Sequence, residues 1–439
     1  MNRILVPTLL VSLLHLLLFT AIGIAQSGSL DTTFGVGGWV TTSVNYDTAS
    51  GWANHVLAQP DGKIVVAVTS RNYENTETSD FYVVRYDSNG ALDASFGVGG
   101  IVRFAFSAAA DGENPYALAL QSDGKILVGG SVQTGGLAGL ARLNGDGSLD
   151  PSFGTGGKLT FTFANRENAR LTSIAVQTNG KIIVGGSSGD IKYGFARLNS
   201  NGTFDTTFNV SGKTTITGYS KSSQFLGTPS PRIAFQPDGK YVIAGGTELI
   251  RKVTLSWTVM RLNANGSLDS SFGSGGMAVT PFAGTWSMAR NVSVLPDGKI
   301  LAGGDWLAGG TSGNSSWVFI RYLANGQLDT SFGSGGKAIF SSPNFRRMTG
   351  MAVLADGRVV GGGFDRAPDS TNSNIMLMRI LSDGSVDNSF GTIGTAYGDY
   401  GGLHDNGTSM ALSPDGKYVV AGQLLGLPNA LVEVSRYLP

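Results

Sequence analysis

Cysteine is absent from this chain of 439 residues, and charged residues are scarce. Without thiols, no disulfide can stabilise the fold and no cysteine-linked lipid anchor can form. Only 14% of the residues are charged, and 31 basic residues balance 31 acidic ones. This balance removes the broad attraction by which basic proteins bind polyanions, so we expect neither a nucleic-acid partner nor an anionic membrane surface.

Histidine is also rare, which limits metal and acid–base chemistry. Beyond the first residues only His55 and His404 remain, one in the first and one in the last of the repeats described below. A ring could bring them together as a weak metal site, and the alternative is two ordinary structural histidines. The loops 87–90 and 144–147 faintly resemble calcium loops, against the alternative of plain turn chemistry. We predict no metal, no cofactor and no catalytic residue.

Long hydrophobic runs are missing except for one at the N-terminus, from Ile4 to Ile24. A basic residue precedes this run and the small-residue step Gly23-Ile24-Ala25 ends it, as in a secretory signal peptide cleaved after Ala25. The alternative is an uncleaved membrane anchor, because the run approaches the length of a bilayer span. We therefore expect residues 1–25 to be a signal peptide and residues 26–439 to be secreted, periplasmic or displayed on the cell surface.

Glycine, in contrast, is abundant, with 65 residues, and it belongs to two patterns that recur in register. The first is Leu-Asp-x-Ser/Thr-Phe-Gly with minor variations, and its aspartates are Asp31, Asp93, Asp150, Asp205, Asp269, Asp329 and Asp387. The second is Asp-Gly-Lys with minor variations, and it begins at Asp61, Asp123, Asn179, Asp238, Asp297, Asp356 and Asp415. A period of about 59 residues indicates seven copies of one supersecondary unit.

Each unit predicts four short antiparallel strands, which we call a, b, c and d. Asp-Gly or Asn-Gly between two apolar runs is typical of a two-residue hairpin turn, here joining strands a and b. A third apolar run ending in arginine gives strand c, and a short run after Phe-Gly gives strand d. Four antiparallel strands in such a repeat make one blade, so we predict an all-β, seven-bladed β-propeller over residues 26–439.

Two further patterns place the strands around the axis. Strand a alternates large and small side chains, as in Leu118, Ala119 and Leu120, which favours the crowded innermost position. The chain begins with a d-type segment and ends with a strand c. We therefore expect the N-terminal strand to pair with the last three strands, with Val40 near Val434, and so to close the ring without an open edge.

The two recurring patterns together resemble those of the delta-60 repeat family, found in exported bacterial proteins and predicted to form propellers. The resemblance covers essentially the whole chain after the signal peptide. It implies the propeller fold and export, but it brings no general set of catalytic residues.

The arginine that ends each strand c lies on an apolar face and requires a partner. These residues are Arg85, Arg142, Arg197, Arg261, Arg321, Arg379 and Arg436. The equally repeated aspartate is the predicted partner, one pair per blade; the alternative is that each aspartate caps its own turn. Either role is structural, because an active site requires a unique constellation rather than seven equivalent ones.

The loops between strands b and c and between d and a vary in length and content, and they share one face of a propeller. Binding residues on a rigid scaffold usually lie in such loops. The candidates are Trp52, Tyr73, Trp286, Trp306, Tyr397, Tyr400 and His404. Aromatic rings at a loop-built mouth suit stacking on sugars or peptide side chains, although packing within their own loops is the alternative. We predict a monomeric, non-catalytic binding or adhesion module for a glycan or protein. The second hypothesis is an extracellular polysaccharide-active enzyme, a lyase or glycoside hydrolase, with paired carboxylates on this face.

Overall fold

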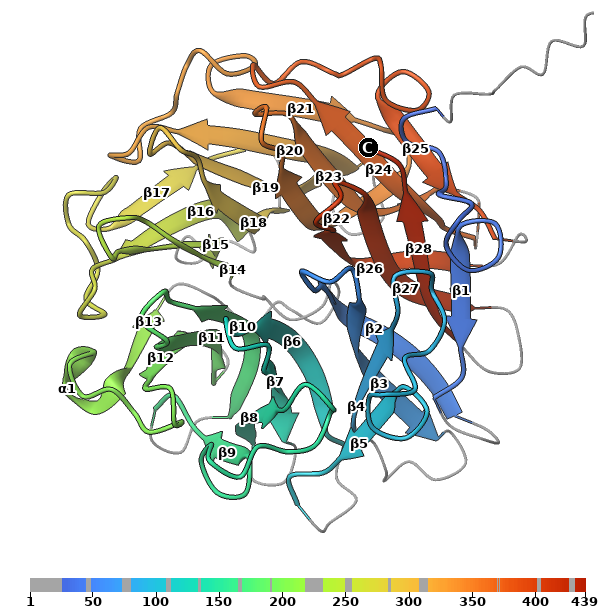
Figure 1. Cartoon of the computed structure of the whole chain (residues 1–439). Helices are drawn as coiled ribbons and strands as arrows, with labels where there is room; N and C mark the ends of the chain where they lie inside the picture. Colours follow the sequence, from blue (N-terminus) through green and yellow to red (C-terminus); the bar gives the residue numbers. More distant parts are fainter. Residues whose placement is uncertain are drawn as a thin grey trace, which may run out of the picture.

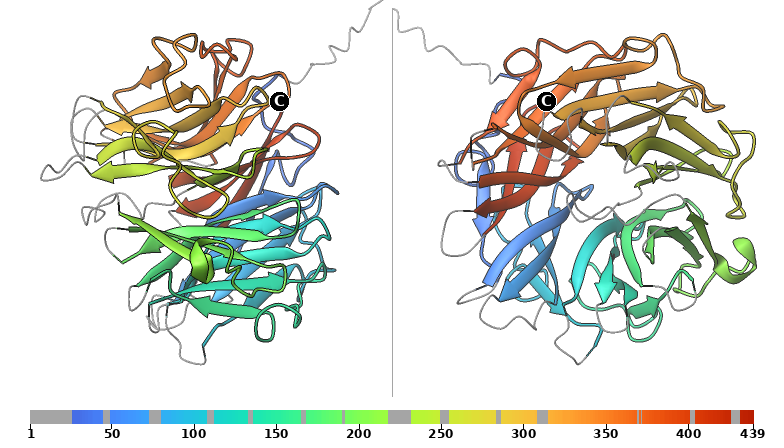
Figure 2. Two further views of the ribbon diagram at one scale, coloured as in Figure 1. Left: turned by 90° about the vertical axis from the view of Figure 1, so that its left-hand side faces the viewer. Right: turned by 180° about the vertical axis from the view of Figure 1, so that it is seen from behind.

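The computed structural model describes residues 26–439 except 45–48, 73–79, 108–111, 133–135, 165–167, 190–191, 218–231, 249–254, 283–285, 308–314, 369, 371, 401–403 and 426–430. The predicted signal peptide lies outside the described residues. Those residues form a seven-bladed β-propeller, as the repeats predict (Figure 1). Figure 2 shows the same ring from the side and from behind.

Each blade is an antiparallel sheet in which strands a to d follow one another outwards from the axis. The first three blades are β2 (Ala49–Ala58), β3 (Ile64–Asn72), β4 (Phe81–Tyr86) and β5 (Ile101–Phe104); β6 (Asn114–Leu120), β7 (Ile126–Val132), β8 (Leu137–Leu143) and β9 (Lys158–Phe161); and β10 (Ala169–Val176), β11 (Ile182–Ser188), β12 (Lys192–Leu198) and β13 (Lys213–Thr217). In the third repeat Asn209 replaces the glycine after Phe, and the four-residue α1 (Asn209–Gly212) forms there.

The remaining blades repeat this order. They are β14 (Arg232–Phe235), β15 (Tyr241–Glu248), β16 (Leu255–Leu262) and β17 (Met277–Thr280); β18 (Trp286–Val294), β19 (Ile300–Leu307), β20 (Ser315–Tyr322) and β21 (Lys337–Ser341); β22 (Phe345–Val353), β23 (Val359–Arg366), β24 (Asn374–Ile380) and β25 (Thr395–Gly398); and β26 (His404–Leu412), β27 (Tyr418–Leu425), β28 (Leu431–Tyr437) and β1 (Trp39–Thr42). One parallel pair, Leu255 with Trp286, joins the fourth and fifth blades edge to edge.

The seventh blade closes the ring in the predicted way. Strand β1 pairs antiparallel with β28, and Val40 lies opposite Val434. Upstream of β1, Leu30 forms a bridge with Tyr437, and the Gly391 N–H of the sixth blade donates to the Ser27 carbonyl at 2.8 Å. In Figure 1 the blue β1 lies beside the red β28, so the two ends of the chain share one sheet.

Strand a occupies the innermost position, also as predicted. Consecutive a strands contact one another around the whole axis: β2, β6, β10, β14, β18, β22 and β26 (Figure 1). In six of these strands the register shifts near the start, which marks a β-bulge. The bulged residues are Asn54, Tyr116, Thr172, Arg290, Thr349 and Thr408. Bulges re-aim side chains, and here they define a ring of positions around the axis.

The glycine pairs of strand b are required by these bulges. A Cβ added to Gly130 would lie 1.9 Å from the Asn114 carbonyl oxygen, across the bulge of its own blade. A Cβ on Gly129 would lie 2.4 Å from the side chain of Leu171 in the next blade. Both backbone and neighbouring blade therefore approach strand b closely at these residues.

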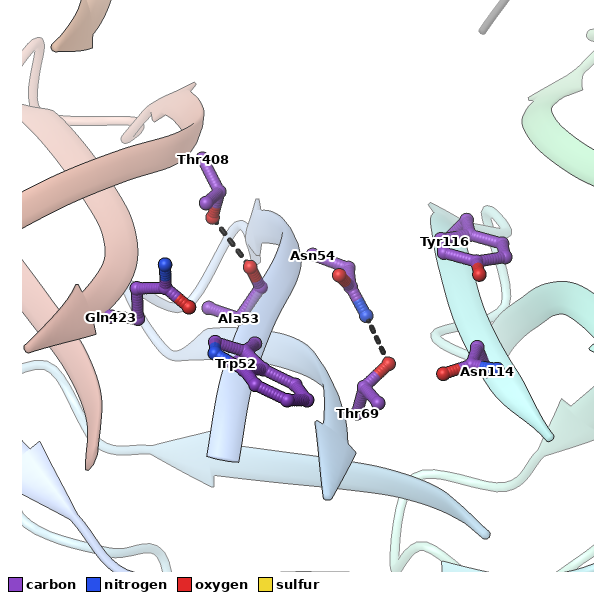
Figure 3. Close-up of a pocket in the computed structure, with 8 residues that line it drawn as sticks. All are labelled: Trp52, Ala53, Asn54, Thr69, Asn114, Tyr116, Thr408 and Gln423. Atoms are coloured by element: carbon purple, nitrogen blue, oxygen red, sulfur yellow. Dashed lines mark hydrogen bonds between the residues drawn. The ribbon is translucent and has the colours of Figure 1, made fainter. Parts of the chain in front are cut away.

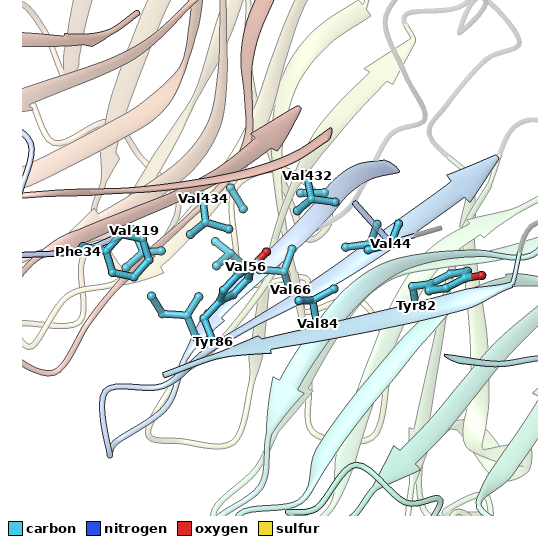
Figure 4. Close-up of a cluster of buried hydrophobic side chains, with 14 residues drawn as sticks. Phe34, Val44, Val56, Val66, Tyr82, Val84, Tyr86, Val419, Val432 and Val434 are labelled. Carbon is cyan, nitrogen blue, oxygen red and sulfur yellow. The ribbon is translucent and has the colours of Figure 1, made fainter. Parts of the chain in front are cut away.

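The hydrophobic core lies between blades rather than within them. Figure 4 shows one such layer, in which Val56, Val66 and Val84 of the first blade pack against Val432 and Val434 of the seventh. Equivalent layers separate the other blades. Because each layer is shared by two blades, the core is continuous only when the ring is closed.

Candidate functional site

The repeated arginines and aspartates form ion pairs in every blade, as predicted. In all seven, the arginine Nε lies 2.6–2.8 Å from an aspartate Oδ2. The pairs are Arg85–Asp93, Arg142–Asp150, Arg197–Asp205, Arg261–Asp269, Arg321–Asp329, Arg379–Asp387 and Arg436–Asp31. The alternative role also holds, because Oδ1 of each aspartate accepts the backbone N–H two residues on. One carboxylate thus binds the arginine and caps its turn.

Sequence reasoning missed the other partners of these pairs, which the second blade illustrates. Lys125 of the Asp-Gly-Lys turn also contacts Asp150, at 2.8 Å. The Arg142 guanidinium lies 4.8 Å from the ring centre of Phe153 and donates to the Ser200 carbonyl of the third blade. The consensus lysine and phenylalanine therefore complete one network, and the arginine joins adjacent blades.

These networks lower the pKa of the aspartates. Burial alone would raise the pKa of Asp31, but hydrogen bonds from Thr33 and Lys417 and the charge of Arg436 outweigh burial and hold the pKa at about 2. The pKa of Asp387 is also about 2, because bonds from Ser389 and Arg379 outweigh burial. These carboxylates are ionised at neutral pH and fully engaged, so the consensus residues have a structural role.

The variable-loop face contains a pocket between the seventh, first and second blades (Figure 3). Its cavity volume is about 270 Å³. The lining residues are Trp52, Ala53, Asn54, Thr69, Asn114, Tyr116, Thr408 and Gln423. They include three of the bulged residues, Asn54, Tyr116 and Thr408, so the bulges at the axis direct side chains into this pocket. The bulge positions are the signal that sequence reasoning lacked, because a one-residue register shift is not visible in the repeat pattern.

Hydrogen bonds hold the pocket wall in place. The Asn54 amide donates to Thr69 Oγ1 and to the Pro115 carbonyl, both at 2.7 Å, and so ties the first blade to the second. The Thr408 hydroxyl donates to the Ala53 carbonyl at 2.5 Å, which ties the seventh blade to the first. Arg170 covers the Tyr116 ring at 5.3 Å. The wall is thus fixed by bonds between blades, and its lining residues are aromatic, amide or hydroxyl in character, apart from one alanine.

The structure disperses the other predicted site residues. Trp286 is half-buried beneath Arg290, at 5.4 Å, and Trp306 is half-buried against Phe282, with ring centres 5.3 Å apart. Tyr397 is 48% exposed on the sixth blade. Of the other candidates, Tyr400 belongs to the sixth blade and His404 to the seventh. Tyr73 lies outside the described residues.

Tyr400 is buried in the core, where its hydroxyl lies 2.7 Å from that of Tyr437, so its ring faces no ligand. His404 is half-buried at the start of β26. Of the predicted residues within the described part of the chain, Trp52 is the one that lines the pocket.

Metal ligands do not gather in the described part of the chain: no group of three or more His, Asp or Glu side chains could hold an ion there. Burial, and to a smaller extent the charge of Arg232, lowers the pKa of His55 to about 3, so this residue is neutral. In the loops compared with calcium sites, Asp87 and Asp146 accept backbone N–H groups at 2.8–3.0 Å, as plain turns do.

A second cavity, of about 540 Å³, opens at the opposite end of the axis between the a–b turns of the first three blades. Its lining includes Gln59, Gln121 and Gln177, which occupy the same position in successive repeats. Their side-chain oxygens are buried and have no hydrogen-bond partner among the residues described. Because these residues belong to the repeated turns, we did not select them from the sequence.

Comparison with known families identifies the repeats. Six segments match the family described as "Domain of unknown function (DUF5122) beta-propeller": residues 59–96, 121–153, 177–208, 236–272, 295–332 and 354–390. Each segment runs from the a–b turn to the Phe that stacks on the strand-c arginine, so the family pattern coincides with the ion-pair network. A comparison with curated proteins found no match.

Solved structures with a similar fold are distant. A family PL25 ulvan lyase bound to a polysaccharide fragment is 12% identical, with a TM-score of 0.46 over 90% of this chain and 96% of that one. Sqt1 of Chaetomium thermophilum, bound to the N-terminus of ribosomal protein L10, is 11% identical, with a TM-score of 0.44 over 91% and 98%. The α-L-arabinanase of Penicillium chrysogenum is 14% identical, with a TM-score of 0.41 over 94% and 96%. At these values the similarities carry no argument about activity. Among the described residues, no helix is long and apolar enough to cross a membrane.

Proposed function

We propose that this propeller, built from DUF5122 beta-propeller repeats, is an exported, non-catalytic glycan-binding module. The observation that supports the proposal is the pocket on the variable-loop face, where Trp52 and Tyr116 lie among amide and hydroxyl side chains. Aromatic faces stack on the apolar faces of sugar rings, and amides and hydroxyls bond to sugar hydroxyls. The pocket volume of about 270 Å³ is near the lower end of the range for small-ligand sites, roughly 300–1,000 Å³, and suits a terminal sugar.

The enzymatic alternative finds less support in this pocket. Glycoside hydrolysis in most families uses two carboxyl groups about 5–10 Å apart at the scissile bond. The described lining of the pocket contains no carboxyl group. Elsewhere on this face, Asp305 and Asp365 are bound to Arg290 and Arg346. Binding without catalysis is therefore the function that this arrangement supports best.

The test is a binding screen of the purified protein against oligosaccharides and cell-wall polysaccharides, with released reducing ends assayed in parallel. Trp52→Ala is expected to weaken binding about 10-fold or more, because a buried aromatic residue at a binding site contributes about 2 kcal/mol. Tyr397→Ala is the matched control, since this exposed aromatic residue lies outside the pocket.

Three results would contradict the proposal: no glycan bound, equal binding by wild type and Trp52→Ala, or new reducing ends. A melting curve for each variant separates lost binding from lost folding.

A further inference from the structure

Three arginines approach the axis from adjacent blades, across the central axis from the pocket and on the same face of the ring. Arg232 begins β14, Arg290 is the bulged residue of β18, and Arg347 lies near the start of β22. These three strands contact one another in the order of the blades. Each arginine is only partly exposed. Three guanidinium groups are thus held together at the centre of the ring, although the chain as a whole has no net charge.

One carboxylate, that of Asp305, pairs with this cluster in the described part of the chain. Among the described residues, the only ion pair made by these arginines joins Arg290 Nε to Asp305 Oδ2. The second oxygen of Asp305 accepts the Met348 N–H at 2.7 Å, so this carboxylate has little capacity left. The Nη2 atom of Arg290 is buried and finds no hydrogen-bond partner among the residues that the structure describes. The cluster therefore holds more positive charge and more donors than its described surroundings satisfy.

The electrostatics of the cluster agree with this count. Burial and the charge of Arg290 lower the pKa of Arg232 to about 10. Burial and the charge of Arg290 likewise lower the pKa of Arg347 to about 9, and Asp305 only partly opposes them. An anion placed between such mutually repelling cations would stabilise their charged forms.

The cluster and the pocket lie at the same level of the axis. Arg290 occupies the bulge position that Asn54, Tyr116 and Thr408 occupy in the pocket wall. His55, which follows Asn54 in β2, lies close enough to Arg232 for the arginine's charge to lower its pKa. A ligand that rests on Trp52 and extends across the mouth would therefore meet the arginines.

We propose that Arg232, Arg290 and Arg347 form a subsite for an anionic substituent, a carboxylate or sulfate, of an acidic glycan whose adjacent sugar occupies the Trp52 pocket. The inference rests on the proposed glycan-binding function and narrows its ligand class. Guanidinium groups suit this role because they are planar, remain charged and donate pairs of hydrogen bonds to carboxylate and sulfate oxygens. The balanced net charge excludes a broad attraction to polyanions but leaves room for local recognition of single charged groups.

The experiment compares a tetragalacturonate, a neutral galactotetraose and a sulfated galactotetraose by titration calorimetry. The acidic ligands are expected to bind at least about 10-fold more tightly than the neutral one, as charge-assisted hydrogen bonds do. Preference for the uronate or for the sulfate ester identifies which anion the subsite takes. Arg347→Gln and Arg232→Gln should each weaken acidic binding about 10-fold and leave neutral binding within about 2-fold.

Arg103→Gln is the matched control for loss of one positive charge. Arg103 lies on β5 and pairs with Asp80, and the Arg103 side chain is 59% exposed. The Arg103→Gln variant should therefore leave all three affinities unchanged. Equal affinity for acidic and neutral ligands, unaffected by Arg347→Gln, overturns the anion subsite while loss of binding in Trp52→Ala still supports the pocket. Tetraglutamate binding as tightly as tetragalacturonate overturns the assignment of the ligand as a glycan.

A final arm keeps the two proposals separate. If no oligosaccharide binds, the glycan-binding function fails, and the anion subsite is then tested with sulfate alone. A larger rise in melting temperature for wild type and Arg103→Gln than for Arg347→Gln supports the subsite. Equal rises in all three proteins overturn it, because general salt effects act on each of them alike.

Discussion

At the scale of single residues, the strand-c arginine is the most heavily used side chain in each repeat. It binds the aspartate of its own blade, stacks on the consensus Phe and, in six blades, donates to a carbonyl of the next blade. Arg142 is representative, with a side chain that is 6% exposed.

We expect Arg142→Met to lower the free energy of unfolding by about 3 kcal/mol, because it leaves the buried Asp150 with one cation fewer and breaks the contact to the third blade. Denaturant unfolding would measure this loss. Arg103→Met, which removes an exposed ion pair, should cost less than about 1 kcal/mol. Equal stability of Arg142→Met and wild type would contradict a structural role for the repeated pairs.

Asp405 provides a pH-dependent prediction. It is fully buried, its Oδ2 accepts the Tyr400 N–H at 2.9 Å, and its Oδ1 has no partner among the described residues. Burial raises the pKa of Asp405 to about 6, the Tyr400 N–H opposes this rise, and the charge of Asp399 adds to it. Glu433 on β28 is also buried, and its carboxyl group has no hydrogen-bond partner in the described part of the chain. Burial, together with the charge of Asp405, raises the pKa of Glu433 well above the usual value.

A pKa raised in the folded state means that the protonated acid favours folding. The contribution of protonated Asp405 to the free energy of unfolding is complete below about pH 4 and is lost as the pH rises through 6. Asp405→Asn keeps the acceptor for Tyr400 without a charge, so it should gain stability over wild type between pH 4 and 8, on the order of 3 kcal/mol. Melting temperatures across this range would show it. Asp123→Asn, at an exposed turn, controls for the loss of a carboxylate, and parallel curves for Asp405→Asn and wild type would refute the prediction.

At the scale of strands, the bulge in strand a and the glycine pair in strand b are two parts of one device. Gly130→Ala should destabilise the protein by about 2 kcal/mol or more, because its Cβ would lie 1.9 Å from the Asn114 carbonyl oxygen, a backbone atom that cannot turn aside. Gly145→Ala is the control, since no atom of the described residues lies within 4 Å of an added Cβ there and the φ of Gly145 is not positive. Similar unfolding free energies for the two variants would argue against the close approach.

Much of this level could be predicted from the sequence, and the limits have physical causes. The hairpin turns, the alternation of strand a and the Arg–Asp pairs follow from local chemistry that repeats in every unit, so seven copies reinforce one interpretation. The bulges could not be predicted, because a shift of one residue changes which side chain points at the axis without changing the repeat pattern. The pocket follows from the bulges, and among the predicted site residues that the structure describes, only Trp52 lines it. The arginine cluster joins three blades and has no signature in any single repeat.

At the scale of the whole molecule, the ring depends on one strand pair between residues almost 400 positions apart. Val40 and Val434 are directly opposite in β1 and β28, which places their Cα atoms within the range that a disulfide can span. Because the chain has no cysteine, Val40→Cys combined with Val434→Cys would contain the only two thiols. The oxidised protein should be more stable than the reduced one by about 3 kcal/mol.

The measurement is unfolding with and without reductant, with Val40→Cys alone as the control. Failure of the two thiols to form a bond in the folded protein would contradict the closure, and so would equal stability of its oxidised and reduced forms.

The shared seventh blade also has a consequence for biosynthesis. Strand β1 is synthesised almost 400 residues before β28, the strand with which it pairs. Strand β1 therefore lacks its partner in the seventh blade while the other six blades are synthesised, and ring closure is a late step of folding.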